Sequence, residues 1–393
     1  MHAAPARRLT WDQVAAFRLS RHFLTERAPR GALVRVLGAM GGAQAQMLPA
    51  AYISLWARVR DMRRRDVQAA GEQRMVVRTW CMRRTLHLVP SDDLAVFVRG
   101  TARRAEREVR SLRGRGVGEG LVDRLVEAAL EALERPRSGP ELVADVARRL
   151  GVPVRGLRWG GWGSGAKIPG ISLGRRVTLH ARGVLHVLGA RAVVCYGPSR
   201  GAAPTFVRAD AWIPQWRDLP QEDAEDELLR RYLRAFGPAT SADFAAWTRM
   251  PMSDARTIWR RREPDLVPVS IEGWTAGILP EDARRLAAAR RGALPVRLLP
   301  YFDSYLLGHE ARGHLVAPRH HRSVYRTAGM ISPVVLVDGR AAGLWSHARD
   351  RGRLLVRVTK FAALSRRTMA GVREEAARLA DFLGSDDVHV QVT

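Results

Sequence analysis

The sequence has few cysteines and no long apolar run. Its 393 residues include only two cysteines, Cys81 and Cys195, which are far apart and flanked by apolar residues. We expect two buried thiols and no disulfide, and no Cys and His cluster has the spacing of a zinc site. A stretch of about 18 apolar residues and an N-terminal apolar segment are also lacking, so we expect no membrane span and no signal peptide. These absences predict a soluble, cytoplasmic protein without a metal or other cofactor.

Arginine carries almost all of the positive charge. The chain has 65 Lys and Arg residues against 39 Asp and Glu residues, a formal net charge of +26, and its only lysines are Lys167 and Lys360. Arginine is the residue of planar, bidentate phosphate and guanine recognition. Because high-GC coding also enriches arginine, composition alone does not identify a partner. The size of the imbalance indicates a polyanion, and nucleic acid is the commonest one.

The length predicts two to four subdomains, and one pattern recurs along the chain. Helices are expected over residues 9–19, 30–40 and 50–65, followed by strand-like residues 75–89. In the helix at 50–65 the apolar side chains should face inward, whereas Arg58 and the arginines after it should face solvent. Helices followed by a strand or hairpin are typical of a winged helix.

The same pattern returns twice. In the second copy we expect two helices, a glycine-rich connection and two strands, at residues 119–135, 138–150, 158–165, 183–188 and 192–196. Ser138 and Glu141 have the spacing of a capping box. In the third copy we expect three helices and a hairpin, at residues 222–236, 241–249, 251–262, 267–271 and 275–279. Three approximate copies indicate tandem winged helices, although no identical residues repeat.

The C-terminal part follows a different plan. Residues 295–307 predict an aromatic-rich strand and a turn around Asp303, and residues 308–327 form a loop rich in His and Arg. Asp338 and Gly339 predict a type I′ turn between two strands. We expect further strands and a helix at residues 354–358, 365–383 and 388–392.

We therefore predict a mainly α protein with small β hairpins and sheets, of the α+β class. The expected domains are a first winged helix at 9–100, a second at 101–215, a third at 216–294, and a C-terminal strand-rich segment at 295–393.

One polar stretch stands out, Gly41-Gly42-Ala43-Gln44-Ala45-Gln46-Met47-Leu48-Pro49. Alternation in an extended segment would place the amides of Gln44 and Gln46 on the same side. The glycine pair permits backbone angles that are closed to other residues, and Pro49 favours the start of a helix. Taken alone, the stretch is far more typical of a polar loop that enters a helix, and the rest of the chain is what favours a site.

Four blocks of the sequence together resemble one family. They are Gln44-Ala45-Gln46, Arg78–Val89 (RTWCMRRTLHLV), Leu299–Gly308 (LPYFDSYLLG) and Val334–Arg340 (VVLVDGR). In this order they resemble bacterial DNA glycosylases of tandem winged helices, which remove bulky N7-alkylated purines and unhook interstrand crosslinks. Some members confer self-resistance to DNA-alkylating antibiotics such as azinomycin. The resemblance spans nearly the whole chain and implies a C-shaped monomer that acts on alkylated double-stranded DNA, in the cytoplasm and associated with the nucleoid.

The resemblance also implies site residues. Gln44 and Gln46 match the catalytic Gln-x-Gln motif of the family, whereas Arg84 departs from its pattern because glycine is usual there. Members press a β-hairpin against the DNA, and we place it at residues 308–327. The candidates for phosphate or groove contacts are Arg83, Arg84, His87, His309, Arg312, Arg319, His320, His321 and Arg322. The alternative for each arginine is a solvated face, and for His87 a core position; Asp303 is expected to be a structural turn residue.

Two glutamines are unusual for the hydrolysis of a glycosidic bond, which normally uses two carboxylates. Glutamine has no useful pKa, so the substrate itself must supply the activation. An N7-alkylguanine does so, because alkylation makes the base cationic and a good leaving group. The enzyme then has to hold a water and stabilise an oxocarbenium-like centre, which an amide oxygen can do. We assign the water to Gln46 and a water or sugar contact to Gln44.

Two other function classes fit part of the sequence. A transcription regulator of tandem winged helices explains the basic charge equally well but gives the Gln-x-Gln stretch no purpose, and regulators usually read a palindrome as dimers. An RNA-binding protein is less favoured, because the aromatic strand signature of an RNA-recognition motif is lacking. A regulator should prefer one DNA sequence, whereas a lesion enzyme should bind duplexes with little sequence preference.

Overall fold

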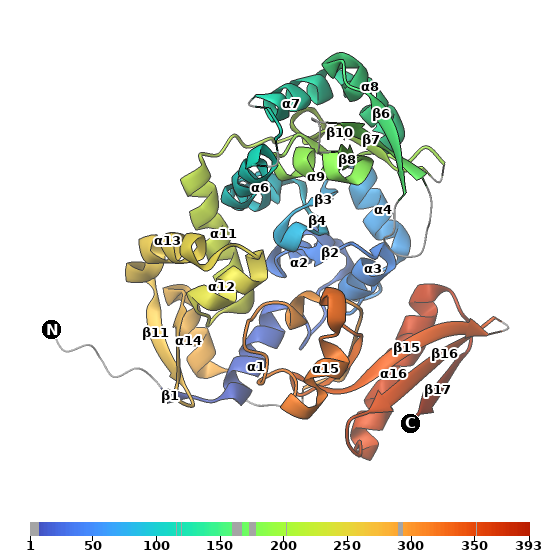
Figure 1. The fold of residues 1–393 in the computed structure, drawn as a ribbon. Helices are drawn as coiled ribbons and strands as arrows, with labels where there is room; N and C mark the ends of the chain where they lie inside the picture. The colour runs from blue at the N-terminus through green and yellow to red at the C-terminus, as the bar shows by residue number, and fades with distance from the viewer. Residues whose placement is uncertain are drawn as a thin grey trace. The chain divides into compact units, whose positions relative to one another are not determined.

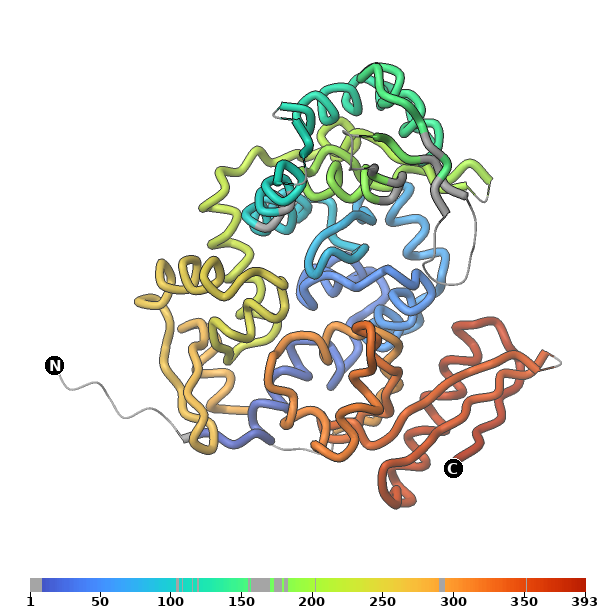
Figure 2. Tube along the Cα trace, in the orientation of Figure 1, coloured from blue at the N-terminus to red at the C-terminus, as the bar shows by residue number. Residues whose placement is uncertain are grey.

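The computed structural model describes residues 8–114, 116–118, 120–158, 167–172, 178–201, 203–289, 294–350 and 352–393. The chain forms two compact units, which are described separately below. The first unit comprises Met1–Ala70, Leu229–Thr248 and Met252–Thr393, and the second comprises Gly71–Leu228 and Arg249–Pro251. Figures 1 and 2 trace the chain through both units. Helices predominate and the sheets are small, so the predicted fold class is confirmed.

The N-terminal elements of the first unit are β1 (Arg8–Leu9), α1 (Trp11–Arg21), η1 (Arg30–Ala32), α2 (Leu33–Ala39), β2 (Ala43–Gln44), α3 (Leu48–Trp56) and α4 (Arg64–Glu72), of which α4 runs on into the second unit. Local signals start two of these helices, α1 and α3. Thr10 and Gln13 form a reciprocal capping box at the start of α1, which satisfies two backbone N–H groups. Pro49 lies in the first turn of α3, where its missing N–H costs nothing.

The single helix expected at residues 50–65 is wrong, because the chain leaves helical geometry after Trp56. The backbone of the next residues pairs with an earlier segment: Ala28 N–H donates to the Arg58 carbonyl oxygen, and Arg60 N–H donates to the Ala28 carbonyl oxygen, both at 2.8 Å. Asp61 then takes a left-handed backbone angle, with φ of 52°. The helical periodicity of the sequence could not reveal this competing partner.

The third predicted copy of helices and hairpin is present in the structure. Its elements are α11 (Gln221–Phe236), α12 (Ser241–Thr248), α13 (Met252–Arg262), η4 (Glu263–Asp265), β11 (Val267–Ile271), β12 (Trp274–Ile278) and α14 (Pro280–Ala288). Strand β1 pairs in parallel with β11, which pairs antiparallel with β12 across the turn at Glu272 and Gly273. The inner face of this three-stranded sheet packs on Val14 and Phe17 of α1 and on Leu286 of α14.

A five-stranded sheet forms the C-terminal part of the first unit (Figure 1). The elements are β13 (Arg297–Leu299), η5 (Ser304–Leu306), η6 (Pro318–His320), α15 (His321–Val324), η7 (Thr327–Gly329), β14 (Val334–Val337), β15 (Arg340–Asp350), β16 (Arg353–Lys360), α16 (Arg366–Leu383) and β17 (Val388–Val392). The strand order is β13-β14-β15-β16-β17, antiparallel except for the parallel pair β16 and β17, which α16 connects. Asp338 and Gly339 both have positive φ, as the predicted type I′ turn requires.

The second unit combines helices with small sheets. Its elements are β3 (Val76–Trp80), η2 (Met82–Arg84), β4 (Leu86–Pro90), η3 (Ser91–Asp93), α5 (Leu94–Arg99), α6 (Ala102–Gly114), α7 (Leu121–Ala132), β5 (Arg137–Ser138), α8 (Gly139–Leu150), β6 (Val154–Arg158), β7 (Lys167–Ser172), β8 (Thr178–His180), α9 (Ala181–Ala190), β9 (Val194–Tyr196), β10 (Thr205–Arg208) and α10 (Ala209–Trp212). Strands β6, β7 and β8 form one antiparallel sheet, and β5, β10 and β9 form another. The predicted capping box at Ser138 and Glu141 opens α8, and Gly151 ends it in a left-handed conformation.

One strand of the second copy is wrong, and one stretch lies outside the described residues. Residues 183–188 belong to α9, because Val184, Leu185 and Leu188 recur at helical spacing and pack into the core of this unit. Most of the glycine-rich stretch at 158–165 lies outside the described residues. The division into four domains at 9–100, 101–215, 216–294 and 295–393 stays a prediction.

Both cysteines are core residues, as expected, and so are several of the tryptophans, whereas Trp80 is half-buried. Trp247, Trp259 and Trp345 are buried. Cys81 and Cys195 are buried free thiols, and burial raises the pKa of Cys195 to about 12. A thiol with such a pKa stays protonated at neutral pH and is a poor nucleophile.

Candidate active site

The Gln-x-Gln stretch is a short, constrained connection between α2 and α3 in the first unit. Gly41 and Gly42 both take left-handed backbone angles, with φ of 72° and 80°. A Cβ atom on Gly41 would lie 3.1 Å from Trp247 Cζ2 and 3.3 Å from Phe236 Cε2. Gly41 is therefore required both by its backbone angle and by its aromatic neighbours.

The two glutamines differ in exposure. Gln44 ends the two-residue strand β2 and is 7% exposed, whereas Gln46 lies in a bend just before α3 and is exposed. The segment is thus extended only at Ala43 and Gln44, and the chain bends at Gln46 before Met47 takes the N-cap position of α3. The expected alternation along one extended strand does not reach Gln46, because the start of α3 follows immediately.

A buried ion pair ties α3 to the third block of the family resemblance. Arg58 Nη1 and Nη2 donate to Asp303 Oδ2 and Oδ1 at 2.8 and 2.7 Å, and both side chains are fully buried. Ser54 Oγ, one turn earlier on α3, donates to Asp303 Oδ2 at 2.7 Å. Backbone N–H of Tyr305 donates to Asp303 Oδ1 at 3.0 Å, which caps η5. Asp303 is thus a structural turn residue, as predicted.

Burial alone would raise the pKa of Asp303, but the charge of Arg58 and the hydrogen bonds from Arg58, Ser54 and Tyr305 outweigh it and lower the pKa below its usual range. Asp303 therefore stays ionised at neutral pH and cannot serve as a proton donor.

The buried position of Arg58 corrects the prediction that this arginine faces solvent. The aromatic neighbours of Asp303 do signal a buried carboxylate, and a buried carboxylate needs a cationic or hydrogen-bonding partner. Arg58 and Asp303 are 245 residues apart, however, and the sequence offers many arginines. Ser54, Arg58 and Ser304 are the residues around the site that sequence reasoning missed.

The residue after Asp303, Ser304, contacts the chain just before the Gln-x-Gln motif. Ser304 Oγ donates to the carbonyl oxygen of Gly42 at 2.7 Å. Tyr305 OH donates to the carbonyl oxygen of Gly339 at 3.2 Å, in the turn of the fourth block. Within the first unit, the third block of the resemblance therefore contacts the fourth block and also Gly42, two residues before the Gln-x-Gln motif.

Two buried histidines, His22 and His309, and the half-buried His314 lie around the end of α11 in the first unit. The ring Nε2 atoms of His22 and His309 each lie 3.0 Å from a backbone carbonyl oxygen at the end of this helix. Arg18 Nη1 donates to His314 Nε2 at 2.9 Å. Burial lowers the pKa of His22 to about 3 and that of His314 to about 2, and places that of His309 well below 6.5. Nearby arginines lower these pKa values further, so the three rings are neutral.

Two of the candidate DNA contacts are buried histidines. His309 is 2% exposed in this cluster. His87 is 1% exposed on β4, where its Nδ1 lies 2.9 Å from the carbonyl oxygen of Thr85 and its Nε2 lies 3.0 Å from Arg83 Nη2. A ring inside the protein cannot reach a phosphate, so the alternative of a core histidine fits both.

Arg83 and Arg84 form a strained turn between β3 and β4. Both take left-handed backbone angles, with φ of 55° and 60°. Arg84 stands where glycine is usual in the family pattern, and the structure explains that preference, because glycine adopts this angle without strain. Arg84 is exposed and its Nε donates to His186 Nε2 at 3.2 Å, whereas Arg83 is half-buried.

The loop at 308–327 is not the β-hairpin that we expected. All of its residues are described, and they form turns, η6 and α15, with one isolated bridge at Tyr325. Arg312 is half-buried and lies over the ring of Tyr325, at 4.1 Å from its centroid. His320 is half-buried and stacks on Phe361. The exposed candidates of this loop are Arg319, His321 and Arg322.

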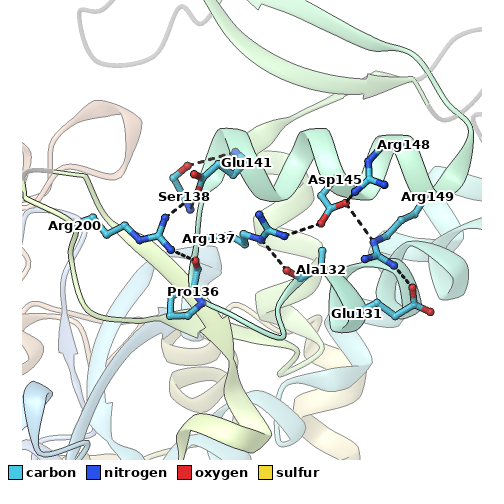
Figure 3. A network of polar contacts seen from close by, with 10 residues as sticks. All are labelled: Glu131, Ala132, Pro136, Arg137, Ser138, Glu141, Asp145, Arg148, Arg149 and Arg200. Atoms are coloured by element: carbon cyan, nitrogen blue, oxygen red, sulfur yellow. Dashed lines mark hydrogen bonds and ion pairs between the residues drawn. The ribbon is translucent and has the colours of Figure 1, made fainter.

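Many arginines are engaged with carboxylates, as a polar network in the second unit shows (Figure 3). Arg137, Arg148 and Arg149 converge on Asp145, which α8 presents to them. Arg149 also pairs with Glu131. The formal charge of the sequence therefore overstates the number of arginines that are available to a polyanion.

In the parts of the chain that the structure describes, no group of three or more His, Cys, Asp or Glu residues could hold a metal ion. Within the same residues, no helix has the length and hydropathy to cross a membrane.

Comparisons with known proteins identify the family of the chain. A family model described as DNA glycosylase AlkZ-like matches residues 37–382. A curated relative from Streptomyces sahachiroi, an interstrand DNA cross-link repair glycosylase, is 32% identical over 98% of this chain and 99% of its own length. The solved structure of Streptomyces sahachiroi DNA glycosylase AlkZ superposes with a TM-score of 0.82, at 29% identity, over 98% of this chain and 100% of the solved chain.

The fold and the matched sequence define a DNA glycosylase, an enzyme that hydrolyses N-glycosyl bonds in DNA. The match covers most of the chain and includes the Gln-x-Gln stretch and Asp303. The chain belongs to the AlkZ-like DNA glycosylase family. Membership decides between the enzyme and the transcription regulator in favour of the enzyme.

Proposed function

We propose that this DNA glycosylase acts on bulky N7-alkylated purines in double-stranded DNA, as a monofunctional enzyme with Gln44 and Gln46 as its catalytic residues. The observation that carries the proposal is the constrained loop from Gly41 to Met47, which presents a Gln-x-Gln motif at the start of α3. A motif held by left-handed glycines and aromatic neighbours suits a reaction that depends on position and not on proton transfer.

The chemistry follows from the charge of the substrate. A purine alkylated at N7 is cationic and leaves as a neutral base, so no general acid is required. The amide oxygen of Gln46 accepts a hydrogen bond from the attacking water and directs its dipole toward the oxocarbenium-like sugar. The exposure of Gln46 supports this role, because the group that holds the water has to reach the substrate.

Gln44 is buried behind this position, at the end of β2. We assign it the support of the water or the sugar from the protein side. The assignment predicts that undamaged guanine is not excised, because a neutral guanine lacks the positive charge that makes it leave.

The relative named as an interstrand cross-link repair glycosylase supports an extension to crosslinks. A crosslinked base cannot be flipped into a closed pocket, so the lesion has to be processed within the duplex. The exposed arginines Arg84, Arg319 and Arg322 are our candidates for phosphate contacts, and their role is to bind the duplex with a steep salt dependence. Such an enzyme serves repair or self-resistance to a DNA-alkylating natural product, and we expect it to act as a monomer.

The test is a duplex that carries one N7-methylguanine, incubated with the purified protein and then cleaved with alkali at abasic sites. We expect strand breaks with the wild type and a loss of at least about 100-fold in the single-turnover rate for Gln46→Ala, the size seen when a preorganised polar group is removed. Gln391→Ala is the matched control, because Gln391 is also an exposed glutamine of the first unit, on β17.

A duplex with a bulky alkyl adduct and a crosslinked duplex extend the same assay. Absence of breaks on all three substrates would refute the proposed substrate class. Full activity of Gln46→Ala would refute the proposed site, and breaks at undamaged guanine would refute the argument from charge.

A further inference from the structure

Two adjacent residues, Asp303 and Ser304, form hydrogen bonds with the chain before and after the Gln-x-Gln motif. Before the glutamines, Ser304 Oγ donates to the carbonyl oxygen of Gly42 at 2.7 Å. After them, Ser54 on α3 and Arg58, two residues beyond the end of α3, both donate hydrogen bonds to Asp303. Along the chain, these two sets of hydrogen bonds lie before and after Gln44 and Gln46.

Both sets of hydrogen bonds are formed by buried side chains. Ser304 is 6% exposed, and the bond to Gly42 joins residues that are 262 apart in the sequence. Asp303 and Arg58 are fully buried and joined by two parallel hydrogen bonds. Bidentate arginine and carboxylate pairs fix orientation as well as distance. The loop can therefore move as a whole only if these buried bonds break.

We propose that Asp303 and Ser304 are positioning residues for the catalytic glutamines. They do not touch the substrate. They set the distance between the Gly42 end of the loop and the last turn of α3, and with it the position of the segment that carries the two amides. This inference rests on the proposed function for its effect on rate, but not for its effect on the loop itself.

The physical reason for such a device is that a glutamine amide has no charge that could compensate for misplacement. Orientation is the whole contribution of a neutral dipole, and a shift of about 1 Å in a reacting group can cost about 100-fold in rate. A buried bond to the backbone just ahead of the motif is an effective way to prevent that shift.

Ser304→Ala removes the bond at the Gly42 end and leaves the ion pair intact. We expect the single-turnover excision rate to fall by about 10-fold to 100-fold, whereas the dissociation constant for the lesion duplex should change by less than about twofold. Ser54→Ala weakens the α3 end without leaving a buried charge unpaired, and should give a loss in the same direction. Both avoid substitution of Arg58 or Asp303, which would endanger the fold.

The matched control is Ser91→Ala. Ser91 is a buried serine whose Oγ donates to the backbone carbonyl oxygen of Arg74, so it has the same chemistry as Ser304 but lies in the second unit. It should lower the melting temperature by a similar amount and leave the excision rate unchanged. The comparison separates a loss of position from a general loss of stability.

Hydrogen exchange of the amides of residues 43–47 gives a readout that needs no activity. In the Ser304→Ala variant these amides should exchange several-fold faster than in the wild type. In the Ser91→Ala variant their exchange rate should be unchanged. The inference is overturned if Ser304→Ala matches Ser91→Ala in rate, or if exchange in the loop is unchanged. If the wild type excises no base, the proposed function fails, and exchange alone then decides whether Ser304 positions the loop.

Discussion

Acid should destabilise this protein well above the pH at which carboxylates titrate, because of three histidines in the first unit. His22, His309 and His314 have folded-state pKa values far below 6.5, owing mainly to burial. In the unfolded chain each would titrate near about 6.5. As the pH falls below that value, the unfolded state binds protons that the folded state does not, so stability is lost.

The magnitude follows from linkage. Between pH 7 and pH 5, a histidine that titrates only when unfolded lowers the free energy of unfolding by about 2 kcal/mol. His22 and His309 are fully buried and together contribute about 4 kcal/mol, and His314, which is partly exposed, adds up to about 2 kcal/mol. A loss of about 4–6 kcal/mol is a large part of the stability of an ordinary domain.

Urea titrations followed by tryptophan fluorescence at pH 7 and pH 5 measure this loss. His309→Gln, which keeps a side-chain hydrogen-bond donor but cannot titrate, should remove about a third to a half of the pH dependence. His389→Gln should leave it unchanged, because His389 is exposed on β17. A loss below about 2 kcal/mol in the wild type, or an unchanged pH dependence in His309→Gln, would refute the reasoning.

Three further substitutions test the local geometry, each measured as the change in the free energy of unfolding. Arg84→Gly should stabilise the protein by about 0.5–1 kcal/mol, since it removes a left-handed arginine, and a destabilised variant would contradict this. Arg58→Met should cost about 3–5 kcal/mol, because it leaves the charge of Asp303 buried and unpaired; a cost under 1 kcal/mol would show that the pair matters little. Gly41→Ala should cost about 1–2 kcal/mol from its backbone angle alone, with added crowding at Trp247, and should slow excision; a neutral effect on both would exclude the constrained loop.

Features that depend on neighbours in the sequence were predictable. The cap at Ser138 and the turn at Asp338 and Gly339 are confirmed, because their geometry is decided within four residues. The burial of Trp247 was also predictable, since large apolar side chains seldom stay exposed. Local chemistry thus recovered individual caps and turns, whereas α5, α6 and α14 had no counterpart among the predicted elements.

Features that depend on distant partners were not predictable. The chain leaves α3 because Ala28 pairs with residues 58–60, and no periodicity records that pairing. Arginine is usually a surface residue, but Arg58 lies in the core because it pairs with Asp303. The sequence did not reveal this pairing, because Asp303 lies 245 residues away. The two catalytic candidates, Gln44 and Gln46, came from the family resemblance, since two amides alone have no pKa or ligand geometry to reveal them.

The carboxylate nearest to the motif in this network is used for position and not for proton transfer. Asp303 is buried, bonded by Arg58, Ser54 and the backbone of η5, and held ionised, so it can neither protonate a leaving base nor reach a water at the exposed Gln46. Under the proposed function, Asp303 gives no acid catalysis to a neutral purine. The proposed site suits a base that already carries its positive charge, and for such a base rigid amides are sufficient. We propose that this buried pair supplies the rigidity that two neutral glutamines need as catalytic residues.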